Sequence, residues 1–197
     1  MRRFIKTVVL ADGYEEVKKV GEKYVVHLDG VADETTQSIV CYECMTDDVP
    51  DLAVLGEELK VWKAYVAERE LEQAKSAKLA ELEAYDQSDA VNGFDVTIAG
   101  QTMSLWIDRE TRADYKSSIE AAELLGLEEV HPVFNGVEVT LSVQMAKMAL
   151  AQVQLYANQC FGVTERHRAA IQQLATVADV EAYDFTTGYP DKLPFSV

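Results

Sequence analysis

Apolar and polar residues alternate in short runs along the first 50 residues, and turn-forming dipeptides separate the runs. A period of two is typical of β-strands, because successive side chains of a strand point to opposite faces. The pattern therefore predicts a small antiparallel β region over residues 1–50, a meander of three or four strands. The predicted strands are Arg3–Leu10, Tyr14–Val20, Lys23–Leu28 and Ser38–Met45, with turns at Asp12-Gly13, Gly21-Glu22 and Asp29-Gly30.

A change of period after residue 46 marks the start of a long helix. Pro50 is allowed in a first helical turn, and the carboxylate of Asp51 suits the positive end of the helix dipole. The predicted helix runs over residues 52–85, which is roughly 50 Å long. Three roles stay open for it: packing on the core of its own domain, a rod between two domains, or a short coiled coil with other copies of the chain. Large apolar residues recur at heptad-like spacing only in its first half, at Leu52, Leu55, Leu59, Trp62 and Val66.

Residues 94–162 carry one pattern twice, a pair of short β-rich runs followed by a helical run that ends at a glycine. The turns are expected at Ala99-Gly100 and Asn135-Gly136, and the helix ends at Gly126 and Gly162, so the landmark glycines keep one offset. Asn-Gly is a strong hairpin signal, and a glycine after an apolar-periodic run is a usual helix stop. We therefore expect a ββα–ββα repeat, in which residues 94–126 would superpose on residues 130–162.

The last 35 residues predict two short helices and an irregular tail. Thr164 is a candidate N-cap for a helix to about Leu174, and Thr176 with Asp179 is a candidate cap for a helix to Tyr183. The aromatic-containing tail after these helices is expected to be docked. The predicted fold is α+β: a small N-terminal antiparallel β domain over 1–50, a long connecting helix over 51–86, and an α+β domain over 87–197 with two hairpin–helix units and short C-terminal helices.

Charge is the strongest bias of the composition. The chain has 18 Lys and Arg against 34 Asp and Glu, a formal net charge of −16. Phosphate backbones and anionic lipid heads repel so acidic a chain, so we set nucleic-acid binding and membrane binding aside as principal activities. No run approaches the roughly 20 apolar residues of a membrane span. The three cysteines are typical of reduced thiols in a cytoplasmic product.

Cys41 and Cys44 have a spacing that resembles a known chemical motif, the CxxC pair. A redox pair needs its first cysteine at a helix N-terminus, whereas these two lie in a predicted strand, where residues three apart point to opposite faces. A structural zinc site would need a second pair of ligands, which Cys160 with one histidine does not supply. We therefore interpret Cys41 and Cys44 as core residues.

The remaining titratable residues offer little catalytic chemistry. His27, His131 and His167 are scattered, and a nucleophile–base pair could only be assembled by the fold. The aspartates at 47, 48 and 51 lack the pattern of a calcium loop and suit helix capping. We therefore predict no catalytic residue, no cofactor-binding residue, no metal ligand and no enzymatic activity.

One apolar stripe at helical spacing is assigned to the core rather than to a ligand pocket. Its members are Leu141, Met145, Met148, Leu155 and Tyr156.

Four aromatic residues are the possible interface anchors. Trp62 and Trp106 are the side chains most able to anchor a protein interface, although each is also suited to the core of its own domain. Tyr189 and Phe195 lie in the tail and are the other two candidates.

From about residue 75 to the end, the chain resembles an uncharacterised domain family found in bacteriophage and prophage tail-region proteins, including those associated with tail fibres and baseplates. The matching segments are Lys78–Asp86, Ser88–Asn92, Trp106–Asp108, Thr111-Arg112, Tyr156-Ala157, Cys160, Val163-Thr164, His167, Tyr183-Asp184 and Thr187–Pro190. The family has no activity to carry over. What the resemblance implies is a context: a virion component or an assembly factor.

We therefore expect a non-enzymatic bacteriophage structural protein, an accessory subunit of the tail, baseplate or fibre-attachment region that is assembled in the bacterial cytoplasm and acts through protein–protein contacts. Its partners would be other phage structural proteins, and homo-oligomers through helix 52–85 are an option. A tail-fibre assembly chaperone absent from the mature particle is one alternative. A small enzyme or host-directed factor, with Cys160, His167 and a carboxylate gathered in one pocket, is the other.

Overall fold

The computed structural model describes residues 2–98, 101–134 and 136–196, and the chain divides into two compact units, Met1–Glu72 and Gln73–Val197. The boundary lies inside helix α1 (Leu52–Asp86), so the first part of this helix belongs to unit 1 and its last part to unit 2. The sequence predicted boundaries at residues 50 and 86, with the helix as a separate connector, whereas the two compact units divide the helix after Glu72. The predicted class is confirmed: the fold is α+β, with an N-terminal antiparallel sheet and a long helix.

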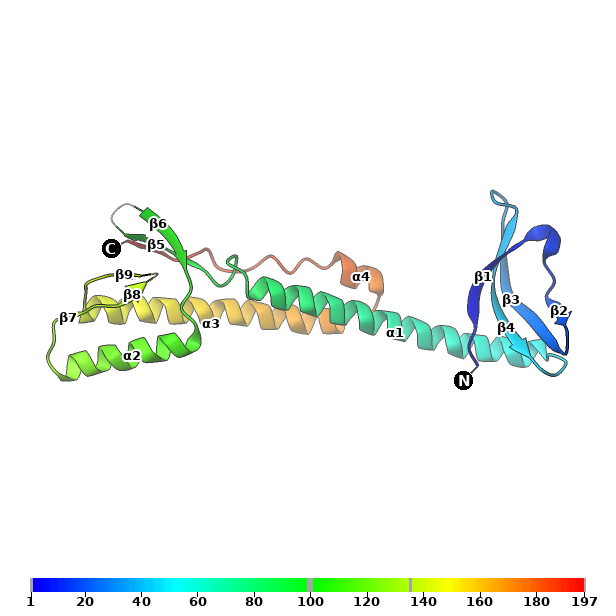
Figure 1. Cartoon of the computed structure of the whole chain (residues 1–197), viewed down its shortest axis with the longest axis horizontal. Helices are drawn as coiled ribbons and strands as arrows, with labels where there is room; N and C mark the ends of the chain where they lie inside the picture. The colour runs from blue at the N-terminus through cyan, green and yellow to red at the C-terminus, as the bar shows by residue number, and fades with distance from the viewer. Residues whose placement is uncertain (1, 99–100, 135, 197) are drawn as a thin grey trace. The chain divides into compact units, whose positions relative to one another are not determined.

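Unit 1 begins with a four-stranded antiparallel sheet in the order β1-β4-β3-β2 (Figure 1). Strands β2, β3 and β4 form the predicted meander, but β1 pairs with β4 and not with β2. A short 3-10 turn over Ala11–Gly13 follows β1. The strands are β1 (Ile5–Leu10), β2 (Val17–Val20), β3 (Lys23–Asp33) and β4 (Ser38–Thr46).

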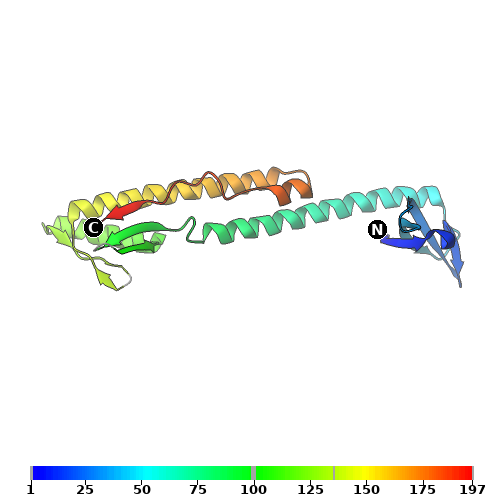
Figure 2. The same cartoon turned by 90° about the horizontal axis from the view of Figure 1, so that it is seen from above.

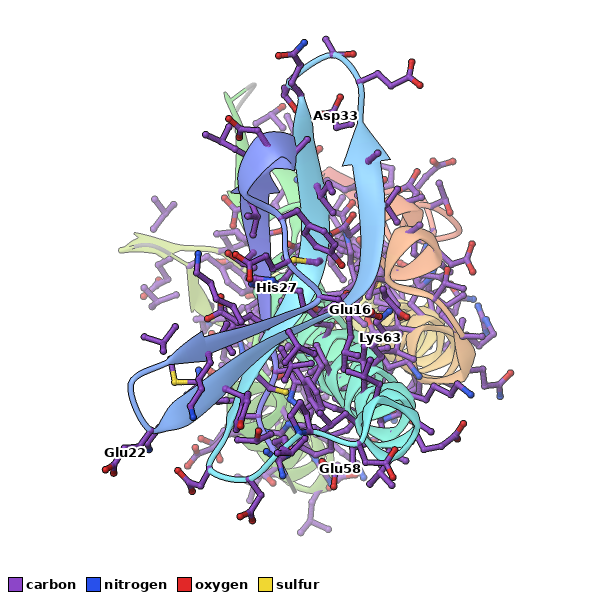
Figure 3. All side chains as sticks on the ribbon, turned by 90° about the vertical axis from the view of Figure 1, so that its right-hand side faces the viewer. Glu16, Glu22, His27, Asp33, Glu58 and Lys63 are labelled. Atoms are coloured by element: carbon purple, nitrogen blue, oxygen red, sulfur yellow. The ribbon has the colours of Figure 1, made fainter. Side chains whose placement is uncertain are left out.

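The turn predicted at Asp29-Gly30 is wrong, because β3 continues through both residues. A bulge between Leu28 and Val31 absorbs them, with Asp29 at a φ of +50°. The chain reverses instead after Asp33, which lies at the far end of β3 in Figure 3. The Asp33 carboxylate accepts hydrogen bonds from the backbone N–H groups of Thr35 at 2.9 Å and Thr36 at 3.3 Å, and this local side-chain bonding favours a turn.

The apolar stripe of α1 packs on the sheet of its own unit. Leu55 and Leu59 are buried against Phe4 and Val26, so the first of the three roles left open is confirmed for this half of the helix. Asp51 starts the helix as predicted, because its carboxylate accepts hydrogen bonds from two N–H groups of the first turn, at 3.0 and 3.2 Å. Because these apolar residues pack on the sheet of unit 1, fewer of them are exposed for a coiled coil with other copies.

Unit 2 contains helices (Figure 2), and its described residues also form three small sheets. The tail is docked as expected, because β11 pairs in parallel with β5 at the edge of a sheet ordered β11-β5-β6. No helix in the described parts of the chain is long and apolar enough to span a membrane. The elements after α1 are β5 (Phe94–Ile98), β6 (Gln101–Leu105), α2 (Arg109–Leu124), β7 (Glu129–Val130), β8 (Val133–Phe134), β9 (Val137–Glu138), β10 (Leu141–Ser142), α3 (Val143–Gln173), α4 (Val177–Ala182) and β11 (Pro194–Ser196).

The first predicted hairpin–helix unit is present, and the second differs from it. β5 pairs with β6, and α2 ends just before Gly126, which has a φ of +69°. In the second unit the two predicted strands are each divided: β8 pairs with β9, and β7 pairs separately with β10. Pro132 lies at the first break, where its carbonyl accepts a hydrogen bond from the N–H of Val139. The predicted turn residues Ala99, Gly100 and Asn135 lie outside the described residues.

The helix end predicted at Gly162 is wrong, and so is the new start at Thr164. α3 runs for 31 residues without a break from Val143 to Gln173. Its buried stripe continues on both sides of the glycine, with Cys160, Val163 and Ile171 in the interior. Tertiary packing of this stripe outweighs the helix propensity penalty of a glycine, about 1 kcal/mol. The short helix capped by Thr176 is confirmed as α4, with the Thr176 hydroxyl accepting from the Asp179 N–H at 3.1 Å.

Candidate binding cleft

α2 and α3 lie side by side in unit 2 (Figure 1). Each has a side-chain cap at its start. The Asp108 carboxylate accepts a hydrogen bond from the Thr111 N–H at 2.7 Å, and this bond lowers the pKa of Asp108. The Ser142 hydroxyl accepts from the Met145 N–H at 3.2 Å. Because a cap satisfies N–H groups that the helix itself cannot, both helices begin at defined residues. These starts set which side chains of the two helices face one another.

A cavity of about 720 Å³ lies between these two helices and the short strands of unit 2. One row of its lining comes from α2 and its C-cap, with Ser118, Ala121 and the cap residue Leu125, and a second row comes from α3, with Met145, Met148 and Gln152. Both rows have i, i+3, i+7 spacing, which places their members on one face of a helix. We call this cavity and its two rows the cleft. Its floor includes Phe94, Val96, Phe134, Leu141, Val153 and Phe195.

Large apolar side chains at the mouth of the cleft are exposed to solvent. Leu125 is 74% exposed and Met148 is 54% exposed, and Leu127 and Met145 are also exposed. The assignment of Met145, Met148 and Leu155 to the core is therefore wrong, although Leu141 and Tyr156 of the same stripe are buried. Methionine side chains are flexible and polarizable, so they adapt to the shape of what they contact. The cleft is an apolar surface without a partner inside the described part of the unit.

The charges around the cleft are negative. Glu129 is an acidic lining residue, and within the described residues no Lys or Arg lines the cavity. Two lysines near the cleft form ion pairs with carboxylates on α2. Lys147 on α3 lies 2.8 Å from Glu123, and Lys116 on α2 lies 3.7 Å from Glu120. These cations therefore add little positive potential at the mouth.

A second cluster of polar side chains surrounds the middle of α3. The Thr164 hydroxyl donates to the Asp86 carboxylate at 2.5 Å and lies 2.9 Å from the Tyr189 hydroxyl. His167, one turn further on, lies 2.8 Å from the Tyr183 hydroxyl and 2.9 Å from the Thr187 carbonyl. We call these residues the Thr164 network. It joins the end of α1, the middle of α3 and the C-terminal tail.

Cys160 and His167 lie in or beside this network without forming a nucleophile–base pair. The Cys160 thiol points to the Val91 carbonyl at 3.9 Å, and the hydrogen-bond partners of His167 are other groups. Burial raises the pKa of Cys160, which keeps the thiol protonated at neutral pH. The nearby carboxylate, Asp86, accepts from Thr164. This arrangement holds the tail to α3 and does not activate the thiol.

The four predicted interface anchors all contact the cores of their own units. Trp62 packs with Phe4 and Tyr42, at ring distances of 5.9 and 5.8 Å. Trp106 lies beneath the Arg112 guanidinium at 5.4 Å. Tyr189 and Phe195 are half-buried partners of Tyr85 and Phe94, at ring distances of 5.6 and 5.5 Å. Their contribution to an interface stays a prediction, because it would have to use the edges that remain exposed.

The candidate chemical residues of unit 1, Cys41, Cys44 and His27, pack and hydrogen-bond within their own unit. Cys41 and Cys44 are buried, and burial raises the pKa of both thiols. His27 in the middle of β3 (Figure 3) lies 2.7 Å from the Glu15 carbonyl and stacks on Tyr14. Within the described residues, no group of three or more His, Cys, Asp or Glu could hold a metal ion. The chemistry of these side chains is that of packing and hydrogen bonding.

Unit 1 also presents an open apolar surface. Val8, Val40 and Val31 lie opposite one another across three strands, and we call them the valine ladder. Val8 is 65% exposed and Val31 is 67% exposed. β1 is an edge strand of the sheet, so the valine ladder reaches the edge. An apolar edge strand can pair with another chain.

The Gln73–Val197 unit coincides with a family match. One protein-family model, described as Domain of unknown function (DUF4376), matches residues 73–187, more than half of the chain. The start of the match lies within α1, at the boundary between the two units. No curated protein and no solved structure matches the chain.

Proposed function

The chain belongs to the DUF4376 family, and we propose that it is a non-enzymatic bacteriophage structural protein, an accessory subunit of the tail, baseplate or fibre-attachment region. It would act through contacts with other phage structural proteins, after assembly in the bacterial cytoplasm. The family description carries no activity, so the proposal rests on the resemblance of residues 75–197 to tail-region proteins and on the surfaces of the two units.

The observation that carries the proposal is the cleft, an apolar cavity whose mouth is flanked by exposed leucines and methionines. Large exposed apolar patches on a folded protein mark sites of interaction. The valine ladder is a second such surface on the other unit. In contrast, Cys160 and His167 are engaged in contacts that hold the fold together. A scaffold with an interaction surface on each unit is what an accessory subunit needs.

Mass spectrometry of gradient-purified phage particles from the source, with copy number per particle, tests this proposal. Presence at a fixed, stoichiometric copy number would support a virion subunit. Absence from particles with co-purification on unassembled fibre protein would overturn it in favour of the assembly chaperone. Absence from both would overturn the structural role and favour the small enzyme or host-directed factor.

A further inference from the structure

We propose that the cleft binds one amphipathic helix of a partner protein, with an apolar face that fills the cavity and basic residues along its flanks. The inference deepens the proposed function and rests on it for the kind of occupant, a protein segment. It assigns to α2 and α3 the recognition of that segment.

The shape of the cleft favours a helix. Its two rows, one on α2 with its C-cap and one on α3, repeat with the i, i+3, i+7 spacing that helices use to pack on one another. Ser118 and Ala121 are small and allow a close approach from α2, whereas Met145 and Met148 adapt from α3. A helix laid between the rows would complete a three-helix arrangement. Apolar helices commonly dock into such grooves through anchors at i, i+3, i+4 and i+7.

The charges of the cleft favour a basic segment. Glu129 lines the cavity, Glu128 precedes it, and Asp114 lies one turn before Ser118 on α2. Lys116 and Lys147 are paired with other carboxylates of α2. Lys or Arg on the flanks of the incoming helix would therefore meet carboxylates near the mouth, which raises the association rate and the specificity.

The same charges disfavour a second copy of this chain in the cleft. Two copies that met through their mouths would bring Glu128 and Glu129 of both chains together, in a protein whose net charge is −16. Like charges brought together at an interface oppose association. A partner of opposite charge does not carry this penalty.

Fluorescence anisotropy of a labelled model peptide tests the inference on the full chain. The probe is an amphipathic Leu/Lys peptide of about 18 residues, roughly five helical turns. Two control peptides are a scrambled Leu/Lys sequence without an apolar face and a Leu/Glu sequence with the same apolar face. We expect saturable binding of the probe, and binding of each control weaker by about tenfold or more. Equal binding of the probe and the scrambled peptide would overturn the proposal, because it would show attraction by net charge alone.

Two variants with the same change of charge on the same helix locate the site. Met148→Lys places a cation in the cleft, whereas Leu155→Lys places one on an exposed position of α3 that does not line the cavity. We expect Met148→Lys to weaken binding by about tenfold and Leu155→Lys by less than about twofold. Equal effects of the two variants would overturn the cleft as the site. If circular dichroism shows that Met148→Lys has lost helix, Gln152→Lys, at another exposed lining position, replaces it.

Sedimentation of the free chain decides between a partner and a second copy. A dimer that Met148→Lys dissociates and Leu155→Lys leaves intact would overturn the proposal in favour of self-association through the cleft. The particle measurement is independent of these results. A chain present in particles with no peptide binding would remove only this inference, whereas peptide binding by a chain absent from particles would remove the proposed function.

Discussion

Thr164 shows how a single hydroxyl can connect three segments of the chain. It is buried in the middle of α3, where its oxygen meets the Asp86 carboxylate, the Tyr189 hydroxyl and the Cys160 carbonyl. Because one hydroxyl has one proton, the bond to Asp86 leaves Tyr189 as the donor in the Thr164–Tyr189 pair. Every buried side-chain nitrogen and oxygen within the described residues has a hydrogen-bond partner. Removal of the Thr164 hydroxyl therefore leaves the Asp86 carboxylate and the Tyr189 hydroxyl each without this hydrogen-bond partner.

We predict that Thr164→Val destabilises the protein by roughly 1–3 kcal/mol, because the carboxylate of Asp86 and the hydroxyl of Tyr189 lose a partner while the shape of the side chain is kept. Urea unfolding measures the change. The matched control is Thr102→Val, at an exposed position of β6, for which we expect a change within about 0.5 kcal/mol. A Thr164→Val variant as stable as the wild type would show that the Thr164 network contributes little to the fold.

Glycine ends one helix of unit 2 and lies inside another. Gly126 lies just after the end of α2 at a φ of +69°, whereas Gly162 lies inside α3 and is helical. In both cases the sequence shows a glycine after an apolar-periodic run. The residues beyond each glycine decide the difference, because those after Gly162 continue the buried stripe and those after Gly126 do not.

Alanine at the two glycines should change stability in opposite directions. We expect Gly162→Ala to stabilise the protein by about 1 kcal/mol, because the glycine is inside a helix and the nearest atom to an added Cβ is the Arg166 guanidinium at 3.7 Å. We expect Gly126→Ala to destabilise it by about 1 kcal/mol, because its backbone is left-handed and no contact compensates. Thermal unfolding of the two variants measures both changes. A destabilised Gly162→Ala would contradict a continuous α3.

The whole molecule consists of two units that share one helix and a large negative charge. α1 contributes Leu55 and Leu59 to the core of unit 1 and Leu82 to the buried residues of unit 2. The net charge of −16 acts on both units, because most of the acidic side chains are exposed. Such self-repulsion favours solubility and opposes the compact state.

Added salt should therefore stabilise the chain. From about 0.1 M to about 1 M, the Debye length falls from roughly 10 Å to roughly 3 Å, which screens the repulsion among the excess carboxylates, whereas the exposed ion pairs that it also weakens each contribute little. We expect the midpoint of urea unfolding to rise with sodium chloride over this range. Urea is the suitable denaturant because it adds no ions. A midpoint that falls with salt would show that the ion pairs, such as Arg2 with Glu58, outweigh the repulsion.

Features that depend on neighbouring residues follow from the sequence alone. The alternation before residue 46, the Asp51 start of α1, the Thr176 cap and the stop at Gly126 are local effects of side-chain direction, capping and backbone freedom, and the structure has each of them. The resemblance of residues 75–197 to a family of tail-region proteins remains a prediction, and the family model matches residues 73–187. The phage context and the proposed function also remain predictions.

Tertiary packing sets the features that depend on segments far apart in the chain. It placed β1 beside β4, carried α3 through Gly162, and left Met145 and Met148 exposed at a cleft that was not predicted. The i, i+3, i+7 row from Ser118 to Leu125 was visible in the sequence, but its meaning depends on α3 lying beside it. The physical reason is burial: periodicity shows which residues share a face, whereas the partner that covers the face is supplied by the fold.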